Sequence, residues 1–232
     1  QLHLVLLEIA GELSGTSEEQ NENDVKAQSP ADIEAGAETQ LRLMYTRHMK
    51  ELKLTGNYLK NKKKKSEFEQ LAYKNIGSFF SEAEKAVQLL AESQFQERLS
   101  YAKKTGELCH GSYNYHNIIF SNGNTAVTNF DKYKNECQIS DLYQFMRKIL
   151  EKYDWDIQTA YKMMEEYDKI KPVSDTERAL LAALFAFPEK FWKVMNYYFN
   201  SNKAWIPPKT KEKLEKVVQQ NEKRQKFLET LL

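Results

Sequence analysis

The stretch Leu108-Cys109-His110-Gly111-Ser112-Tyr113-Asn114-Tyr115-His116-Asn117 decides how this chain is interpreted. It leads into Ile118-Ile119-Phe120 and Ala126-Val127-Thr128, two short runs of β-forming residues on either side of Ser121-Asn122-Gly123-Asn124. Asn-Gly supplies the positive φ angles that a tight turn requires, so the sequence predicts a β-hairpin here. Thr128-Asn129-Phe130-Asp131 follows, and Asp141-Leu142 opens the next helical pattern.

The order and spacing of these residues resemble the aminoglycoside phosphotransferase and choline kinase superfamily. Its catalytic loop reads His-Gly-Asp, four residues and Asn, and a hairpin and an Ile-Asp-Phe metal loop come next. A closer resemblance is to the CotS-type spore coat proteins, a branch of that superfamily, through the lysine-rich stretch, Ser66-Glu67-Phe68-Glu69, Cys109-His110-Gly111 and Tyr115-His116-Asn117. The resemblance extends from about Leu41 to the C-terminus and implies one helical lobe.

The resemblance also assigns a role to each position of the loop. Phosphoryl transfer needs a carboxylate that orients and deprotonates the acceptor hydroxyl, and an Asn and an Asp that hold magnesium. Ser112 stands at the position of the catalytic Asp, and its neutral hydroxyl cannot act as a general base near neutral pH. Asn129 stands at the position of the metal-loop Asp and brings no negative charge.

Other positions of the family pattern are retained. Asn117 matches the second metal ligand, and His110, Gly111 and Asp141 match residues that hold the loop in shape. We expect the side chains of Ser112, Asn117 and Asn129 to converge on one cleft.

Two hypotheses about function follow. The first is a noncatalytic, kinase-like spore coat protein with a structural or ligand-binding role, which needs no cofactor. The second is a small-molecule phosphotransferase with an altered site that uses ATP and magnesium. There Asp131 would ligate the metal, and His116 or Asp141 would act as the base.

The rest of the chain predicts a mainly α (α+β) fold with one central hairpin. Apolar residues recur at three- and four-residue spacing from Phe68 to Ala91, then from Leu142 to Leu150 and from Ile157 to Tyr167. Ser174 and Glu177 have the form of a capping box that opens a helix reaching Phe187. Pro188 suits the first turn of another helix, and Pro207-Pro208 precedes a last one over 209–232.

We expect 1–232 to form a single kinase-like C-lobe, with the degenerate catalytic loop, hairpin and metal loop at 108–131. Residues 2–13 favour a first helix, which resembles the helix just after the hinge of such kinases, so the small N-lobe is expected to be absent from this chain. Residues 16–39 are acidic, poor in large apolar side chains, and predict a mobile loop. Because the sequence starts at Gln1, we expect it to be a piece of a longer protein.

Composition limits the partners. The chain has 34 basic and 33 acidic residues, so its net charge does not favour nucleic acid, and no segment is long and apolar enough for a membrane. The resemblance implies a spore coat location, with a cytoplasmic one otherwise, and other coat proteins or a small ligand as partners. The charged C-terminal helix together with residues 16–39 is a third candidate, a bare interaction module.

Three further groups have both a structural and a functional interpretation. The lysines at 62–65 favour a solvated helix end over an anion site. His110 and His116 lack a third metal ligand nearby, and Cys109 favours a buried, inert thiol over a nucleophile. The aromatic residues favour core packing over a ligand cleft; they include Trp192, Tyr197, Tyr198, Phe199 and Trp205.

Overall fold

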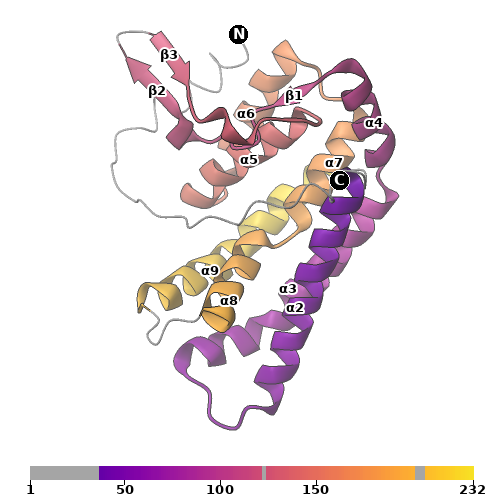
Figure 1. Cartoon of the computed structure of the whole chain (residues 1–232). Coiled ribbons are helices and arrows are strands. Elements are labelled where there is room, and N and C mark those ends of the chain that lie inside the picture. Colours follow the sequence, from indigo (N-terminus) through magenta and orange to yellow (C-terminus); the bar gives the residue numbers. More distant parts are fainter. Residues whose placement is uncertain (1–36, 122–123, 202–206) are drawn as a thin grey trace. The chain divides into compact units, whose positions relative to one another are not determined.

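The computed structural model describes residues 37–121, 124–201 and 207–232, and within them the chain is mainly helical (Figure 1). The predicted first helix and most of the predicted acidic loop lie outside the described residues. Helix α2 begins at Ala37, so residues 37–39 are helical rather than part of that loop. The eight described α-helices are α2 (Ala37–Asn61), α3 (Glu67–Glu92), α4 (Phe95–Thr105), α5 (Ile139–Lys152), α6 (Ile157–Ile170), α7 (Asp175–Ala186), α8 (Glu189–Asn200) and α9 (Lys209–Glu229).

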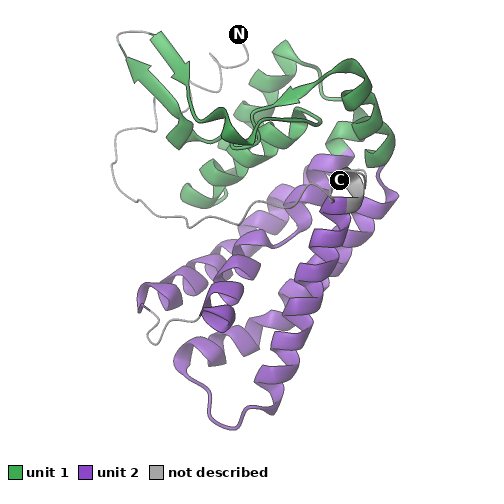
Figure 2. Cartoon of the chain, viewed as in Figure 1, with its two compact units in different colours: residues 1–39, 95–178 green, residues 40–94, 179–232 purple. Residues whose placement is uncertain are grey.

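The chain divides into two compact units that are interleaved in sequence (Figure 2). Unit 1 comprises Gln1–Thr39 and Phe95–Arg178, and unit 2 comprises Gln40–Gln94 and Ala179–Leu232. Unit 2 therefore starts before the middle of the chain, is interrupted by unit 1, and is completed by the C-terminal helices. The loop 108–117, which carries the family resemblance, lies wholly in unit 1.

In unit 2, α3 follows the predicted apolar pattern. Ser66 caps its N-terminus: the Ser66 hydroxyl accepts from the Glu69 N–H, and the Glu69 carboxylate accepts from the Ser66 N–H. The apolar stripe of α3 is buried, and α9 packs against this helix. The buried residues of the stripe are Phe68, Ala72, Ile76, Phe79, Ala83, Ala86 and Leu90.

Polar and aromatic contacts also hold the helices of unit 2 together. Arg224 of α9 is buried, forms an ion pair with Glu82 of α3, and donates to the carbonyl groups of Phe185 and Ala186 at the end of α7. His48 of α2 stacks on Trp192 of α8 with ring centroids 3.4 Å apart.

The aromatic groups named from the sequence pack against other rings. Tyr198 stacks on Phe68 at 3.9 Å, and Phe199 meets the edges of neighbouring rings. Trp192, Tyr198 and Phe199 thus pack against other rings and are half-buried, whereas Tyr197 is exposed, contrary to the expected core packing, and Trp205 lies outside the described residues.

Unit 1 contains α4, α5, α6 and two small antiparallel sheets (Figure 1). The predicted hairpin is confirmed: β2 (Ile118–Ser121) pairs with β3 (Asn124–Val127), with Ile118 opposite Val127. The expectation of one hairpin was incomplete, because β1 (Leu108–Cys109) also pairs with β4 (Lys134–Asn135). This second sheet therefore joins the residues just before the loop that starts at His110 to residues that lie beyond the hairpin.

Two predicted helix starts can be compared with the structure. The capping box at α7 is confirmed, since the Glu177 N–H donates to the Ser174 hydroxyl at 3.2 Å and the Ser174 N–H donates to the Glu177 carboxylate at 3.1 Å. Pro188 lies one residue before α8, at its N-cap, rather than inside the first turn.

Candidate functional site: the loop between β1 and β2

Asp141 fixes the start of the loop. This residue lies in the first turn of α5, and its two carboxylate oxygens accept from the N–H groups of His110, at 2.6 Å, and Gly111, at 3.0 Å. Burial raises the pKa of Asp141, while the two N–H donors act in the opposite direction. The carboxylate is therefore committed to holding the loop, which is the role that the family resemblance implied for it.

His110 joins the loop to the end of the hairpin. Its Nε2 lies 2.9 Å from the carbonyl oxygen of Thr128, and its Nδ1 accepts from the Ser112 N–H at 3.2 Å. Because a carbonyl can only accept, this arrangement requires a neutral ring with its proton on Nε2. His110 thus has the structural role that the sequence favoured.

His116 is separated from this arrangement. Its side chain is exposed, and its backbone N–H donates to the Asn114 side chain at 3.0 Å. Within the described part of the chain, no group of three or more His, Cys, Asp or Glu residues could hold a metal ion. A site made by His110 and His116 therefore has no support in the geometry.

Gly111 is required by the close approach of two loops. Its φ angle is +74°, in the left-handed region, and a Cβ atom at this position would overlap the backbone carbonyl of Lys132. Lys132 ends the 3₁₀ helix η3 (Phe130–Lys132), which follows the hairpin. The loops at the catalytic and metal-binding positions of the family pattern are therefore in backbone contact.

Ser112, Asn117 and Asn129 lie close together, and Asn117 contacts both of the others. The Asn117 amide donates to the Ser112 carbonyl oxygen at 2.7 Å and lies 3.5 Å from the Ser112 hydroxyl. The Asn129 amide donates to the side-chain oxygen of Asn117 at 3.4 Å. We call these three residues the amide triangle; none of its side chains carries a charge.

Asn129 has a left-handed backbone, with φ 65° and ψ 59°, which Asn tolerates better than most residues. Asp131 lies two residues further, within η3, and its side chain is exposed. The carboxylate that the alternative hypothesis invokes as metal ligand thus lies two residues after Asn129 in sequence, and it takes no part in the hydrogen bonds of the amide triangle.

The amide triangle does not fit a magnesium ion. Mg²⁺ in kinase sites is bound through carboxylates and substrate phosphates, and the triangle supplies only amide and hydroxyl groups. The Asn117 oxygen, which is the ligand that the family pattern retains, already accepts a hydrogen bond from Asn129.

Cys109 is a buried thiol below the loop. Its Sγ lies 3.1 Å from the Glu136 carbonyl oxygen, and burial raises the pKa of the thiol far above its usual value. A thiol in this state is a poor nucleophile, so the structure agrees with the interpretation as a packing residue.

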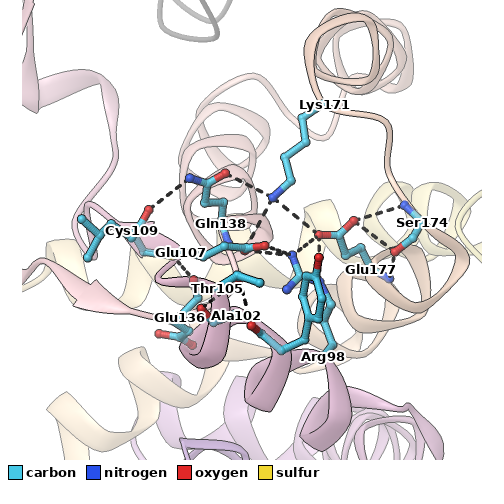
Figure 3. A network of polar contacts seen from close by, with 12 residues as sticks. Arg98, Ala102, Thr105, Glu107, Cys109, Glu136, Gln138, Lys171, Ser174 and Glu177 are labelled. Atoms are coloured by element: carbon cyan, nitrogen blue, oxygen red, sulfur yellow. Dashed lines mark hydrogen bonds and ion pairs between the residues drawn. The ribbon is translucent and has the colours of Figure 1, made fainter.

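A network of ion pairs that sequence patterns did not reveal supports the strand β1 (Figure 3). Arg98 of α4 binds both oxygens of Glu107 at 2.8 Å and one oxygen of Glu177 at 2.8 Å. Lys171 lies 3.6 Å from Glu107 and 3.8 Å from Glu177 and donates to Gln138, which in turn donates to the Leu108 carbonyl. Glu107 directly precedes β1, so the network fixes the residues from which the loop starts.

A β-strand, a His-Gly loop held by an Asp at the start of a helix, a 3₁₀ turn ending in Asn and a hairpin together define the helical lobe of a kinase-like phosphotransferase fold. The structure of an aminoglycoside phosphotransferase from Alicyclobacillus acidocaldarius is similar, with a TM-score of 0.76 and 20% identity over 82% of this chain and 57% of that one. The family model described as "Spore coat putative kinase YutH" matches residues 37–231, so the chain belongs to this family.

A curated relative agrees with this assignment. Spore coat protein S of Bacillus subtilis is 20% identical over 166 residues, which are 71% of this chain and 47% of that protein. The chain thus spans about half the length of the curated relative and of the solved structure that it matches. Within the described residues, no helix combines the length and apolarity needed to cross a membrane.

Proposed function

We propose that this chain is the helical lobe of a noncatalytic kinase-like protein of the spore coat, which uses the retained fold for assembly or for holding a ligand. The family match and the similarity to Spore coat protein S support the location. Its partners are then other coat proteins or a small ligand.

The amide triangle is the observation that carries the proposal. In a working site, Ser112 and Asn129 would be carboxylates, and Asn117 would turn its oxygen toward the metal. Here Asn117 bonds to both of the others: its amide lies 2.7 Å from the Ser112 carbonyl oxygen, and its side-chain oxygen accepts from Asn129. The scaffold that holds the loop, His110, Gly111 and Asp141, is nevertheless complete.

The second candidate function is phosphoryl transfer from ATP to a hydroxyl group through an altered site. One observation favours it: the exposed carboxylate of Asp131 lies on η3, directly after the metal-loop position. The likeness to an aminoglycoside phosphotransferase is compatible with either function, because it concerns the fold.

Calorimetric titration of the full-length protein with ATP and magnesium separates the two candidates. We expect the wild type to show no magnesium-dependent nucleotide binding, and the double variant Ser112→Asp/Asn129→Asp to gain it. If neither binds, nucleotide is not the retained ligand and the noncatalytic function stands. Magnesium-dependent binding by the wild type that is lost in Asp131→Asn, together with transfer to a hydroxyl acceptor, would establish the enzyme instead.

A further inference from the structure

The strongest unassigned feature is a cationic loop between α2 and α3, in unit 2. From Lys60 to Lys65 the sequence is Lys-Asn-Lys-Lys-Lys-Lys, five lysines without an acidic residue. A solvated run of this kind is usually irregular. This one is held in a defined shape by several contacts.

Within residues 62–65, the first and the last lysine, Lys62 and Lys65, face the protein. Lys62 forms an ion pair with Glu69 at 2.6 Å, and Lys65 donates to the Lys62 carbonyl oxygen at 2.6 Å. Each ammonium group also lies over a tyrosine ring, at 5.6 Å for Lys62 over Tyr58 and at 4.9 Å for Lys65 over Tyr73. These contacts immobilise the ends of the loop.

The end of the loop is fixed as well. Gln70 donates to the Lys65 carbonyl oxygen at 3.1 Å, and the Ser66 hydroxyl, which caps α3, lies 3.0 Å from the Tyr198 hydroxyl. The inner pair, Lys63 and Lys64, is exposed, and among the described residues neither ammonium group pairs with an acidic side chain. The fold thus presents two adjacent cations on a preorganised loop.

The first turn of α9 extends this positive surface. Lys211 forms an ion pair with Glu67 at 2.5 Å, which brings the start of α9 beside the start of α3. Lys209 and Lys213 are exposed on the same turn, which also carries one exposed acidic residue, Glu212. Glu67 and Glu69, at the start of α3, are both paired with lysines outside the inner pair, so neither carboxylate neutralises Lys63 or Lys64.

We propose that this surface, formed by Lys63, Lys64 and the first turn of α9, binds an acidic segment of a partner polypeptide. Its cations are all lysines, and the forked guanidinium groups that favour phosphate are missing from it. The nearby tyrosines Tyr58 and Tyr73 each have a lysine ammonium group over the ring, and both side chains stay exposed, so base stacking is tested directly with an oligonucleotide below. A preordered loop loses less entropy on binding, which favours a specific partner over a diffuse counter-ion cloud.

The surface lies in unit 2 and shares no residue with the amide triangle, so the inference is independent of whether the protein is catalytic. The test uses the full chain and a fluorescent peptide of ten glutamates, with binding followed by anisotropy at low and physiological salt. We expect binding that weakens with salt, and about a tenfold loss in Lys63→Gln/Lys64→Gln. Thermal unfolding should be unchanged, since neither side chain supports the fold.

The matched control is Lys103→Gln/Lys104→Gln, which removes two adjacent exposed lysines at the end of α4. Retained binding in this control supports a specific site, whereas an equal loss in both variants overturns it. The proposal also fails if the wild type does not bind the peptide at low salt. A single-stranded oligonucleotide, or vesicles of anionic lipid, binding more tightly than the peptide would overturn the assignment to polypeptide.

Discussion

The Cα atom of Gly111 faces the backbone carbonyl of Lys132 so closely that no side chain fits between them. Gly111→Ala would place a methyl group on that carbonyl and force a left-handed φ on an L residue. We expect a loss of about 2 to 4 kcal/mol in the free energy of unfolding, measured by denaturant titration.

Gly77→Ala is the control for this substitution. Gly77 lies within α3, and a Cβ atom there would have no neighbour within 4 Å. Alanine should stabilise the helix by about 0.5 to 1 kcal/mol. Equal effects of the two substitutions would contradict the loop contact.

Asp141→Asn tests whether the carboxylate is needed to shape the loop. The amide can accept from only one of the two N–H groups of His110 and Gly111 and turns a second donor toward the other. We expect a loss of about 1 to 3 kcal/mol in unfolding free energy and broadened amide resonances of the loop. Asp131→Asn, at an exposed position, should change stability by less than about 0.5 kcal/mol.

Arg98→Met should be the most damaging of the charge removals in unit 1. It leaves the carboxylates of Glu107 and Glu177 with Lys171 as their remaining cation, at 3.6 and 3.8 Å. We expect about 3 kcal/mol of destabilisation by calorimetry or denaturant unfolding, partly recovered by adding Glu177→Gln. Lys169→Met breaks only surface pairs, with Glu166 and Glu165, and should leave the stability nearly unchanged. A similar cost for both would show that the network is not buried in solution.

The lowered pKa of the buried His48 should make the free energy of unfolding depend on pH. Burial, and then the charge of Arg47, lower its pKa to about 4, although Glu189 acts in the opposite direction and Lys193 in the same one. The unfolded chain therefore takes up a proton near pH 6.5 that the folded chain accepts only near pH 4. The stabilisation is complete above pH 6.5 and is lost as the pH falls toward 4, by up to about 3 kcal/mol.

The readout for His48 is the unfolding free energy between about pH 7 and pH 5.5, a range in which ordinary carboxylates remain largely ionised. His48→Leu cannot be protonated, so its stability should stay nearly flat across that range. A variant that declines as steeply as the wild type would assign the effect to another group.

Local signals predicted the parts of the fold that they encode. The hairpin followed from β-forming runs around Asn-Gly, and the capping box at Ser174 followed from a three-residue spacing. The helices α3, α5 and α6 followed from apolar periodicity. The pairing of β1 with β4 was missed because two-residue strands have no period, and their partners come from the far side of the loop.

The order of the motifs predicted which residues form the candidate site. It did not predict how their side chains bond. The resemblance placed Ser112, Asn117 and Asn129 together, and in the structure Asn117 contacts both of the others. The poor fit of the candidate site to magnesium depends on which side-chain oxygen accepts a hydrogen bond from which amide. That pairing is visible only in the three-dimensional structure. The Arg98 network was also invisible, since Arg98 and Glu177 are joined only when α4 and α7 are brought together.

The interleaving of the two units sets the order in which the chain can fold. Helix α3 must wait for α9, its packing partner, until the chain has been synthesised as far as Glu229. Residues Phe95–Arg178 of unit 1 form a continuous segment and can become ordered earlier, during translation. Until α9 is added, the part of α3 that packs against it stays uncovered, so a chain truncated before Lys209 should be a substrate for chaperones and prone to aggregate.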